Sequence, residues 1–485
     1  MPVTTRSANR TSRPKIPYDI QLCVLDWLVV LGKADSNVDL SPYATVCKAW
    51  QVIIERQLFH HLTLTLKDLS LFSKYCRERK HYVKHILLEI WLSHKVGNDM
   101  DKVCFTEATE TLFLELSTWE VHGITLEFGI VPWTAQGQRF YPGRPKNFYI
   151  RYGPPPRKRS LDGHLRNSDK LELFGPYGEP NPVFNVSEFP MNRALDILGY
   201  AHLTFHDDSK AGTSLLAQVD CVSKLLIRRR YMPKISIQSL STIVKSLTSL
   251  ESLQLERWCY PHPLYHHDRA SDFDGMGLAL PETLKDLTYY KECGDNYDHR
   301  GDENLHRLDP LFISPLNKVA DRIEHIAISF SGSSLLSPNA NYEFTALKTL
   351  AITSNGLFNH VYGVVDVPLL INAASVAKRM PKLEIFETWC FKNQTPLVAR
   401  VFTYERLGEY SSRIAWKDNW GPLKLSGRVQ DAWKQVVDEE NATLEVKYEF
   451  LTFKETQGVR TSLGEMRPHL LLGNRILHDI TWTQV

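Results

Sequence analysis

The sequence lacks a long hydrophobic run and an excess of charge of either sign. Its most apolar early stretch, residues 24–31, is interrupted by Asp26 and is far shorter than the roughly 20 apolar residues that a membrane-spanning helix needs. Lys and Arg number 57 and Asp and Glu number 55, a formal net charge of +2. A dedicated nucleic-acid binder usually carries a clear basic excess. These absences predict a soluble chain whose partners are neither membranes nor nucleic acids.

Paired cysteines and a secretion signal are also missing. The chain has eight cysteines, none in a C-x-x-C pair, so neither a zinc site nor a redox motif is indicated. Residues 1–15 carry four basic side chains and no apolar stretch, whereas a signal peptide needs an apolar segment. We therefore expect a disordered basic tail at 1–15 and a reducing compartment, with the protein in the cytoplasm, the nucleus or both.

Motifs of catalysis are absent as well. No phosphate-binding G-x-x-x-x-G-K-[ST] loop and no G-x-S-x-G nucleophile elbow occurs, and Gly275-Met276-Gly277 lacks the third glycine of a dinucleotide site. The sequence gives no support for an enzyme and predicts neither a catalytic residue nor a cofactor nor a metal.

What the chain does contain begins with helical periodicity over residues 16–62. Pro17 suits the first position of a helix, and apolar residues then recur at helical spacing from Ile20 to Leu28. Ser41-Pro42 is typical of a second helix start, and apolar residues follow it at helical spacing from Tyr43 to Ile54. This segment is predicted to be a small helical module.

A pattern of apolar-x-x-apolar-x-apolar recurs from residue 83 to residue 388, at steps of 24 to 39 residues where units are adjacent. Leucine-rich repeats run at about 20–29 residues, so several units are long. Clear units are Leu250/Leu253/Leu255 and Ile323/Ile326/Ile328. Because a strand places alternate residues into a shared core and a helix covers it, the pattern predicts an irregular α/β solenoid over 63–395.

Two regions depart from the repeat. Residues 129–195 hold ten of the 26 prolines and are predicted to be a surface insertion. In residues 396–485, apolar and polar residues alternate from Leu444 to Phe450, which indicates a half-buried strand. We expect a small α+β cap at this end of the chain.

Residues 16–59 resemble an F-box. The matching positions are Ile16-Pro17, Asp19-Ile20, Val24-Leu25, Leu28, Val46-Cys47-Lys48 and Trp50. Ile16 replaces the usual leucine, and the loop from Leu31 to Asp39 is longer than typical. The whole chain is similar to a fungal group of F-box-like proteins of unknown substrate. The resemblance implies a three-helix F-box-like module followed by a leucine-rich repeat-like domain.

The same resemblance implies a function. An F-box protein is the substrate receptor of an SCF cullin-RING ubiquitin ligase: its F-box binds a Skp-type adaptor, and the downstream domain selects the target protein. The adaptor-binding residues implied are Ile16, Pro17, Ile20, Val24, Leu25, Leu28, Val46 and Trp50. Two alternatives stay open: a non-catalytic scaffold with a vestigial F-box, and a helical hairpin that merely caps the solenoid.

The site for the unknown protein partner is predicted on the sheet face away from the repeat core. Side chains at the x positions point to that face, because successive residues of a strand alternate. The candidates on it or at its rim are Arg228, Arg229, Arg230, Arg257, Trp258 and Trp389. The arginines could equally be plain solvent-facing residues, and the tryptophans could be core packing.

Overall fold

The computed structural model describes residues 17–34, 40–91, 99–131, 203–206, 216–228, 235–258, 278–292, 310–329, 335–337, 343–358, 364–365, 367–392, 397–421, 423–436, 442–453 and 463–482. The tail at 1–15 lies outside these ranges, as does the proline-rich insertion apart from residues 129–131, which are the end of a strand.

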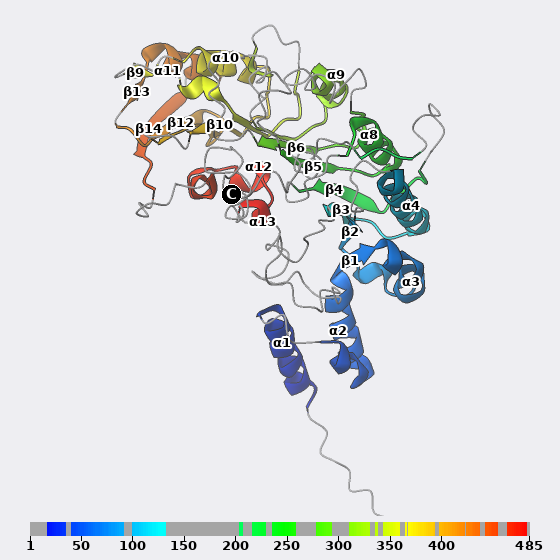
Figure 1. Cartoon of the computed structure of the whole chain (residues 1–485). Helices are drawn as coiled ribbons and strands as arrows, with labels where there is room; N and C mark the ends of the chain where they lie inside the picture. Colours follow the sequence, from blue (N-terminus) through cyan, green and yellow to red (C-terminus); the bar gives the residue numbers. More distant parts are fainter. Residues whose placement is uncertain are drawn as a thin grey trace, which may run out of the picture.

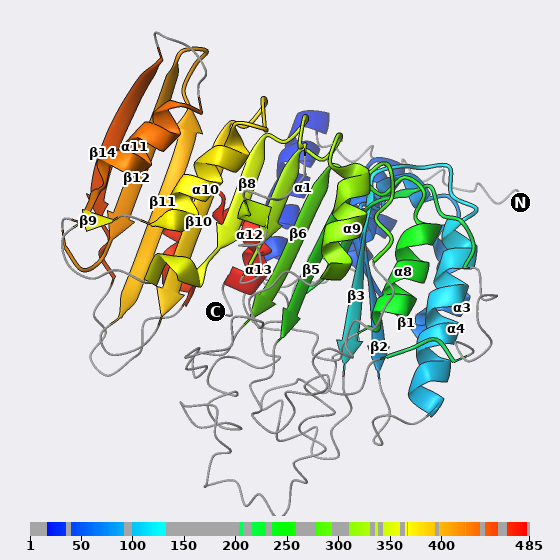
Figure 2. The same ribbon diagram turned by 90° about the horizontal axis from the view of Figure 1, so that it is seen from above.

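One twelve-stranded sheet forms the body of the molecule, with its strands side by side in chain order (Figures 1 and 2). Its strands are β1 (His61–Thr65), β2 (His85–Trp91), β3 (Ile124–Val131), β4 (Val222–Ile227), β5 (Ser252–Trp258), β6 (Asp286–Glu292), β7 (His325–Ile328), β8 (Thr349–Thr353), β10 (Ile385–Lys392), β11 (Val398–Arg406), β12 (Ser411–Asp418) and β14 (Thr443–Phe450). A separate parallel pair joins β9 (Val364–Val365) and β13 (Lys424–Leu425).

Parallel pairing runs from β1 to β10, and the register places equivalent repeat positions opposite each other. Leu253 of β5 pairs with Leu287 of β6, which pairs with Ile326 of β7, and Leu350 of β8 follows. Only β11 is antiparallel, with β10 on one side and β12 on the other. Each unit of the predicted apolar pattern overlaps one strand, from β2 to β8 and then β10. The chain is therefore a mixed α/β protein with a mostly parallel sheet.

Helices cover one face of this sheet, which we call the outer face (Figure 1). They are α3 (Leu66–Cys76), α4 (Asp99–Leu116), α8 (Ile237–Ser246), α9 (Pro310–Val319), α10 (Pro368–Ala377) and α11 (Gly427–Lys434). Short 3-10 helices are η2 (Lys80–Tyr82) and η7 (Asn355–Phe358). Thr65 and Asp68 form a capping box at the start of α3, in which the Thr65 backbone N–H donates to the Asp68 side chain at 2.9 Å.

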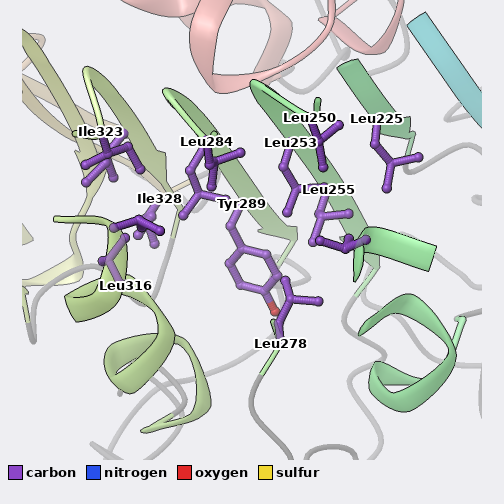
Figure 3. Close-up of a cluster of buried hydrophobic side chains, with 14 of the residues drawn as sticks. Leu225, Leu250, Leu253, Leu255, Leu278, Leu284, Tyr289, Leu316, Ile323 and Ile328 are labelled. Carbon is purple, nitrogen blue, oxygen red and sulfur yellow. The ribbon is translucent and has the colours of Figure 1, made fainter. Parts of the chain in front are cut away.

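The outer core is a continuous row of apolar side chains between the sheet and these helices. Figure 3 shows its centre, where Leu253, Leu255, Leu284 and Tyr289 and their neighbours from adjacent repeat units stack side by side. Each is 3% exposed or less. Repetition of the apolar triplet thus produces both the strand order and the core.

The N-terminal module has three helical segments: α1 (Tyr18–Ala34), η1 (Ser41–Thr45) and α2 (Lys48–His60). The continuous helix expected from Ser41 to Ile54 is wrong. Cys47 is extended, with φ −164° and ψ 169°, and this separates η1 from α2. The N-cap residue of η1 is Leu40, so Ser41 is the first residue of this 3-10 helix and not the N-cap that the sequence predicts.

The C-terminal region contains the predicted strand, β14, and a helix, α11. Of the apolar residues of this strand, Leu444 and Val446 are half-buried, whereas Tyr448 and Phe450 are exposed. The strands of this region do not form a unit apart from the sheet. β11, β12 and β14 extend the same twelve-stranded sheet. The chain then passes to the opposite face, which we call the inner face, as η8 (Leu463–His469), α12 (Gly473–Ile476) and α13 (Asp479–Trp482) (Figure 1). We call residues 463–482 the C-terminal segment.

Candidate functional site

The N-terminal module has a small core of its own. Leu25 and Val29 of α1 meet Leu40, Ile54 and Leu58, and all five are at most 9% exposed. A five-residue core fixes α1 against α2 but is too small to enclose every apolar side chain of the module.

A second apolar stripe of α1 faces away from that core. Ile20, Val24, Trp27 and Leu31, at spacings of four, three and four, are 53%, 43%, 69% and 45% exposed. We call these four residues the α1 stripe. Apolar residues at this spacing normally mark a buried helix face, and a contiguous exposed apolar patch marks a contact surface for another molecule. Val46, 59% exposed, adds a further apolar side chain in the same module.

The residues implied for adaptor binding therefore divide into two groups. Pro17, Ile20, Val24 and Val46 are exposed. Leu25 is 1% exposed in the module core, and Leu28 and Trp50 are partly buried against it, so these three support the module from inside. Ile16 lies outside the described residues. Sequence reasoning missed Trp27, although its spacing from Ile20 and Val24 was available as a signal.

Because Leu25 belongs to this core, its replacement tests folding and not docking. Leu25→Ala is expected to cost about 2 kcal/mol, the low end for a buried leucine, and to unfold residues 17–60 locally. Hydrogen exchange should show lost protection in α1 and α2 with unchanged protection in β5 to β8. Equal loss in the sheet would contradict an independent module core.

The module is joined rigidly to the sheet. α2 ends at His60 and β1 begins at His61. Arg79 donates to Glu55 at 2.7 Å, and its guanidinium lies 5.3 Å from the centre of the Phe59 ring. This hydrogen bond from Arg79 holds the pKa of Glu55 below its usual value. The helix against which α1 packs, α2, is therefore linked to the sheet both through the chain and through side-chain contacts.

The inner face carries buried carboxylates that bind backbone N–H groups of the C-terminal segment. The two oxygens of Glu387 accept from the amides of Leu471 and Leu472, at 2.6 and 3.1 Å. Glu256 accepts from the His478 amide at 2.7 Å. In the opposite sense, the Thr288 hydroxyl donates to the Arg475 carbonyl at 2.8 Å. Glu387 and Glu256 are 0% and 1% exposed.

Small side chains form the floor beneath the segment. Ala327, Ala351 and Ala399, from three different strands, leave room above the sheet, and Tyr290 and Trp389 stand among them. The segment fills that room with apolar residues: Met466, Leu470, Leu472, Ile476, Leu477 and Trp482. Shape and polarity of the two surfaces are thus matched.

Of the residues predicted for partner binding, the structure describes the side chains of Arg228 and Trp389 only, and both are buried. Arg228 is 3% exposed and donates through Nε to Glu127 at 2.5 Å, so the interpretation of Arg228 as a solvent-facing rim residue is wrong. Trp389 is fully buried in the inner cluster. Arg229 and Arg230 lie outside the described residues, and of Arg257 and Trp258 only the backbone, at the end of β5, is described.

Burial shifts several titratable groups at the contact. Burial raises the pKa of Glu387 to about 7, although the two backbone amides act in the opposite direction. Burial, with the charge of Arg228, lowers the pKa of His478 to about 4. Burial also lowers the pKa of His325, whose Nε2 lies 3.4 Å from Arg475. Closing the segment over the sheet therefore has an electrostatic cost.

Comparison with known proteins adds one similarity. Residues 279–478 match a family described as "Family of unknown function (DUF6546)". The match begins just before β6 and ends in the C-terminal segment, so it includes most of the inner-face contact. No curated protein matches the chain. Within the described part of the chain, no helix is long and apolar enough to cross a membrane, and no three His, Cys, Asp or Glu side chains group as metal ligands.

Proposed function

We propose that the chain is an F-box-type substrate receptor. The N-terminal module binds the Skp-type adaptor of an SCF ubiquitin ligase, and the sheet domain, a leucine-rich repeat-like solenoid, binds the protein to be modified. The observation that carries the proposal is the α1 stripe. It lies within the F-box-like residues and exposes an aromatic and three aliphatic side chains in one line.

Two further features support it. The stripe is separate from the module core, so a partner can bind there without unfolding the module. The direct α2–β1 junction and the Glu55–Arg79 pair connect the module to the sheet without an intervening linker, which suits a receptor that must present its target to an enzyme. The consecutive parallel strands with helices on one face support the solenoid interpretation.

The adaptor prediction is tested with charged substitutions on the stripe. Val24→Glu and Trp27→Glu should each weaken binding of the purified Skp-type adaptor at least about thirtyfold, because a hot-spot loss is about 2 kcal/mol or more. Titration calorimetry gives the affinity. The matched control is Leu114→Glu, which places the same charge on an equally exposed leucine of α4, 67% exposed, and should leave binding unchanged.

Retained affinity in both stripe variants would overturn the assignment of the surface. If the unmodified chain itself fails to bind the adaptor, the scaffold with a vestigial F-box becomes the better description. Cross-linking at position 27 would then identify what covers the stripe.

A further inference from the structure

The C-terminal segment contacts the sheet without joining it. Its three elements are short helical turns, and in the described part of the chain none of its backbone groups extends the sheet ladder. The links to the strands that the structure shows are made by sheet side chains: Glu387, Glu256 and Thr288 bind the segment's backbone, and Lys417 donates to the His469 carbonyl at 3.3 Å. The segment is held as a bound peptide is held.

The C-terminal segment takes no part in the main hydrophobic core. The outer core between the sheet and its helices contains no residue of 463–482. The apolar residues of the segment belong to a second cluster, on the inner face. Neither the sheet ladder nor the outer core therefore includes a residue of the segment.

Buried carboxylates distinguish this contact from one whose only role is to cover the sheet. A purely apolar sheet face could be covered with a smaller desolvation free energy, because a buried carboxylate is unfavourable unless hydrogen bonds compensate it. Glu387 and Glu256 lie on β10 and β5, at two ends of the contact, and each accepts a backbone N–H of the segment; Glu256 also accepts from the Gln254 side chain at 2.8 Å. The inner face thus selects a segment that presents free backbone N–H groups at two separated points.

We propose that the inner face over β5 to β11 is a peptide-binding site, and that the C-terminal segment occupies it as an intramolecular ligand. The external ligand is a segment of a partner protein with the same chemistry: aliphatic anchors in short helical turns, free amides toward Glu387 and Glu256, and a cation where Arg475 approaches Asp286, 3.7 Å apart. This deepens the proposed function, on which it rests for the identity of the partner as the receptor's target.

The covalent attachment of the C-terminal segment determines how tightly a partner segment must bind in order to replace it. A tethered ligand competes at an effective concentration of about millimolar, so a partner segment must bind more tightly than the C-terminal segment does, or the segment must be weakened first.

The experiment uses the full chain and a fluorescent synthetic peptide with the sequence of residues 463–482, without adaptor. Leu472→Asp removes an apolar anchor and places a carboxylate beside Glu387, so the tethered segment should leave the site. Fluorescence anisotropy should then show the peptide binding to Leu472→Asp at least about tenfold more tightly than to the unmodified chain. Leu407→Asp, on an exposed leucine between β11 and β12, is the matched control and should behave like the unmodified chain.

Adding Glu387→Gln to Leu472→Asp should reduce that peptide binding, which locates it at the inner face. A folded Leu472→Asp variant that binds no peptide would overturn the proposal. Loss of the cooperative thermal transition in that variant would also overturn it, because the segment would then be part of the fold. Hydrogen exchange of the unmodified chain gives an independent measure: the amides of Leu471, Leu472 and His478 should open more readily than those of β6. Adaptor affinity, measured separately, decides the proposed function by itself.

Discussion

Asp418→Ala is expected to lower the free energy of unfolding by about 3–5 kcal/mol, because it leaves a guanidinium buried without its carboxylate. Arg400 of β11 and Asp418 of β12 are register partners and are 4% and 1% exposed. Arg400 Nε donates to Asp418 at 2.8 Å, and Arg400 Nη1 donates to the Leu357 carbonyl of η7 at 2.5 Å. The pair therefore joins η7 to the outer face.

Urea denaturation of the unmodified chain and the variant measures this loss. Two controls separate the charge from the shape. Asp418→Asn keeps the size of the side chain and should cost less than alanine. Arg400→Met combined with Asp418→Leu removes both charges and should recover most of the stability, since well-packed apolar pairs often replace buried ion pairs without loss. A double variant as unstable as Asp418→Ala would mean that the lost packing, and not the unpaired charge, sets the cost.

The strand order was predictable from the sequence because it is repetitive. Each unit such as Leu284/Leu287/Tyr289 commits three residues to the same core, and neighbouring units must stack to bury them. The local apolar pattern therefore also determines which strands are neighbours in the sheet. The second and third apolar residues of each triplet lie in its strand, whereas the first precedes the strand in every unit except that of β4, which begins at Val222. The long steps between units, up to 39 residues, did not change the order of the strands.

The inner face was not predictable in the same way. Glu387 occupies an x position of its repeat, and Glu256 directly follows the last apolar residue of its own repeat. Both alternate with the core residues of their strands, where a polar residue normally indicates solvent. Their partners are backbone amides 222 and 84–85 residues further along the chain, in short turns that have no periodicity. A face predicted to be open for a partner is therefore covered between β5 and β11, and nothing local in the sequence indicates it.

The N-terminal module was predictable from the sequence only in part. Helical spacing identified Ile20, Val24, Leu25 and Leu28 together, but α1 has apolar residues on two faces, and periodicity alone does not say which face meets α2. The structure separates them: Leu25 is inside, and Ile20 and Val24 are outside. Trp27 completes the exposed stripe.

Glu387 is expected to make a large contribution to the pH dependence of stability, and the direction of its pKa shift gives the sign of that contribution. The pKa of this carboxyl rises from 4.5 to about 7 in the folded chain. Between those values the folded protein retains a proton that the unfolded chain has released, so the free energy of unfolding falls as pH rises. Above pH of about 7 the full penalty is present, about 3 kcal/mol. Lys417 and Glu405 face the same carboxyl from β12 and β11 and shift its pKa in opposite directions.

His478 obscures this effect in the unmodified chain. Its pKa falls from 6.5 to about 4 on folding, so its contribution to stability rises with pH over much of the same window. Only a difference between variants isolates Glu387. We expect the stability of the unmodified chain relative to Glu387→Gln to fall by about 3 kcal/mol between pH 4.5 and 8, measured by urea denaturation. Glu384→Gln, three residues away at an exposed position, should give a flat difference. A flat difference for Glu387→Gln as well would show that the C-terminal segment does not exclude water from the Glu387 carboxylate, and the inner-face contact would then be open in solution.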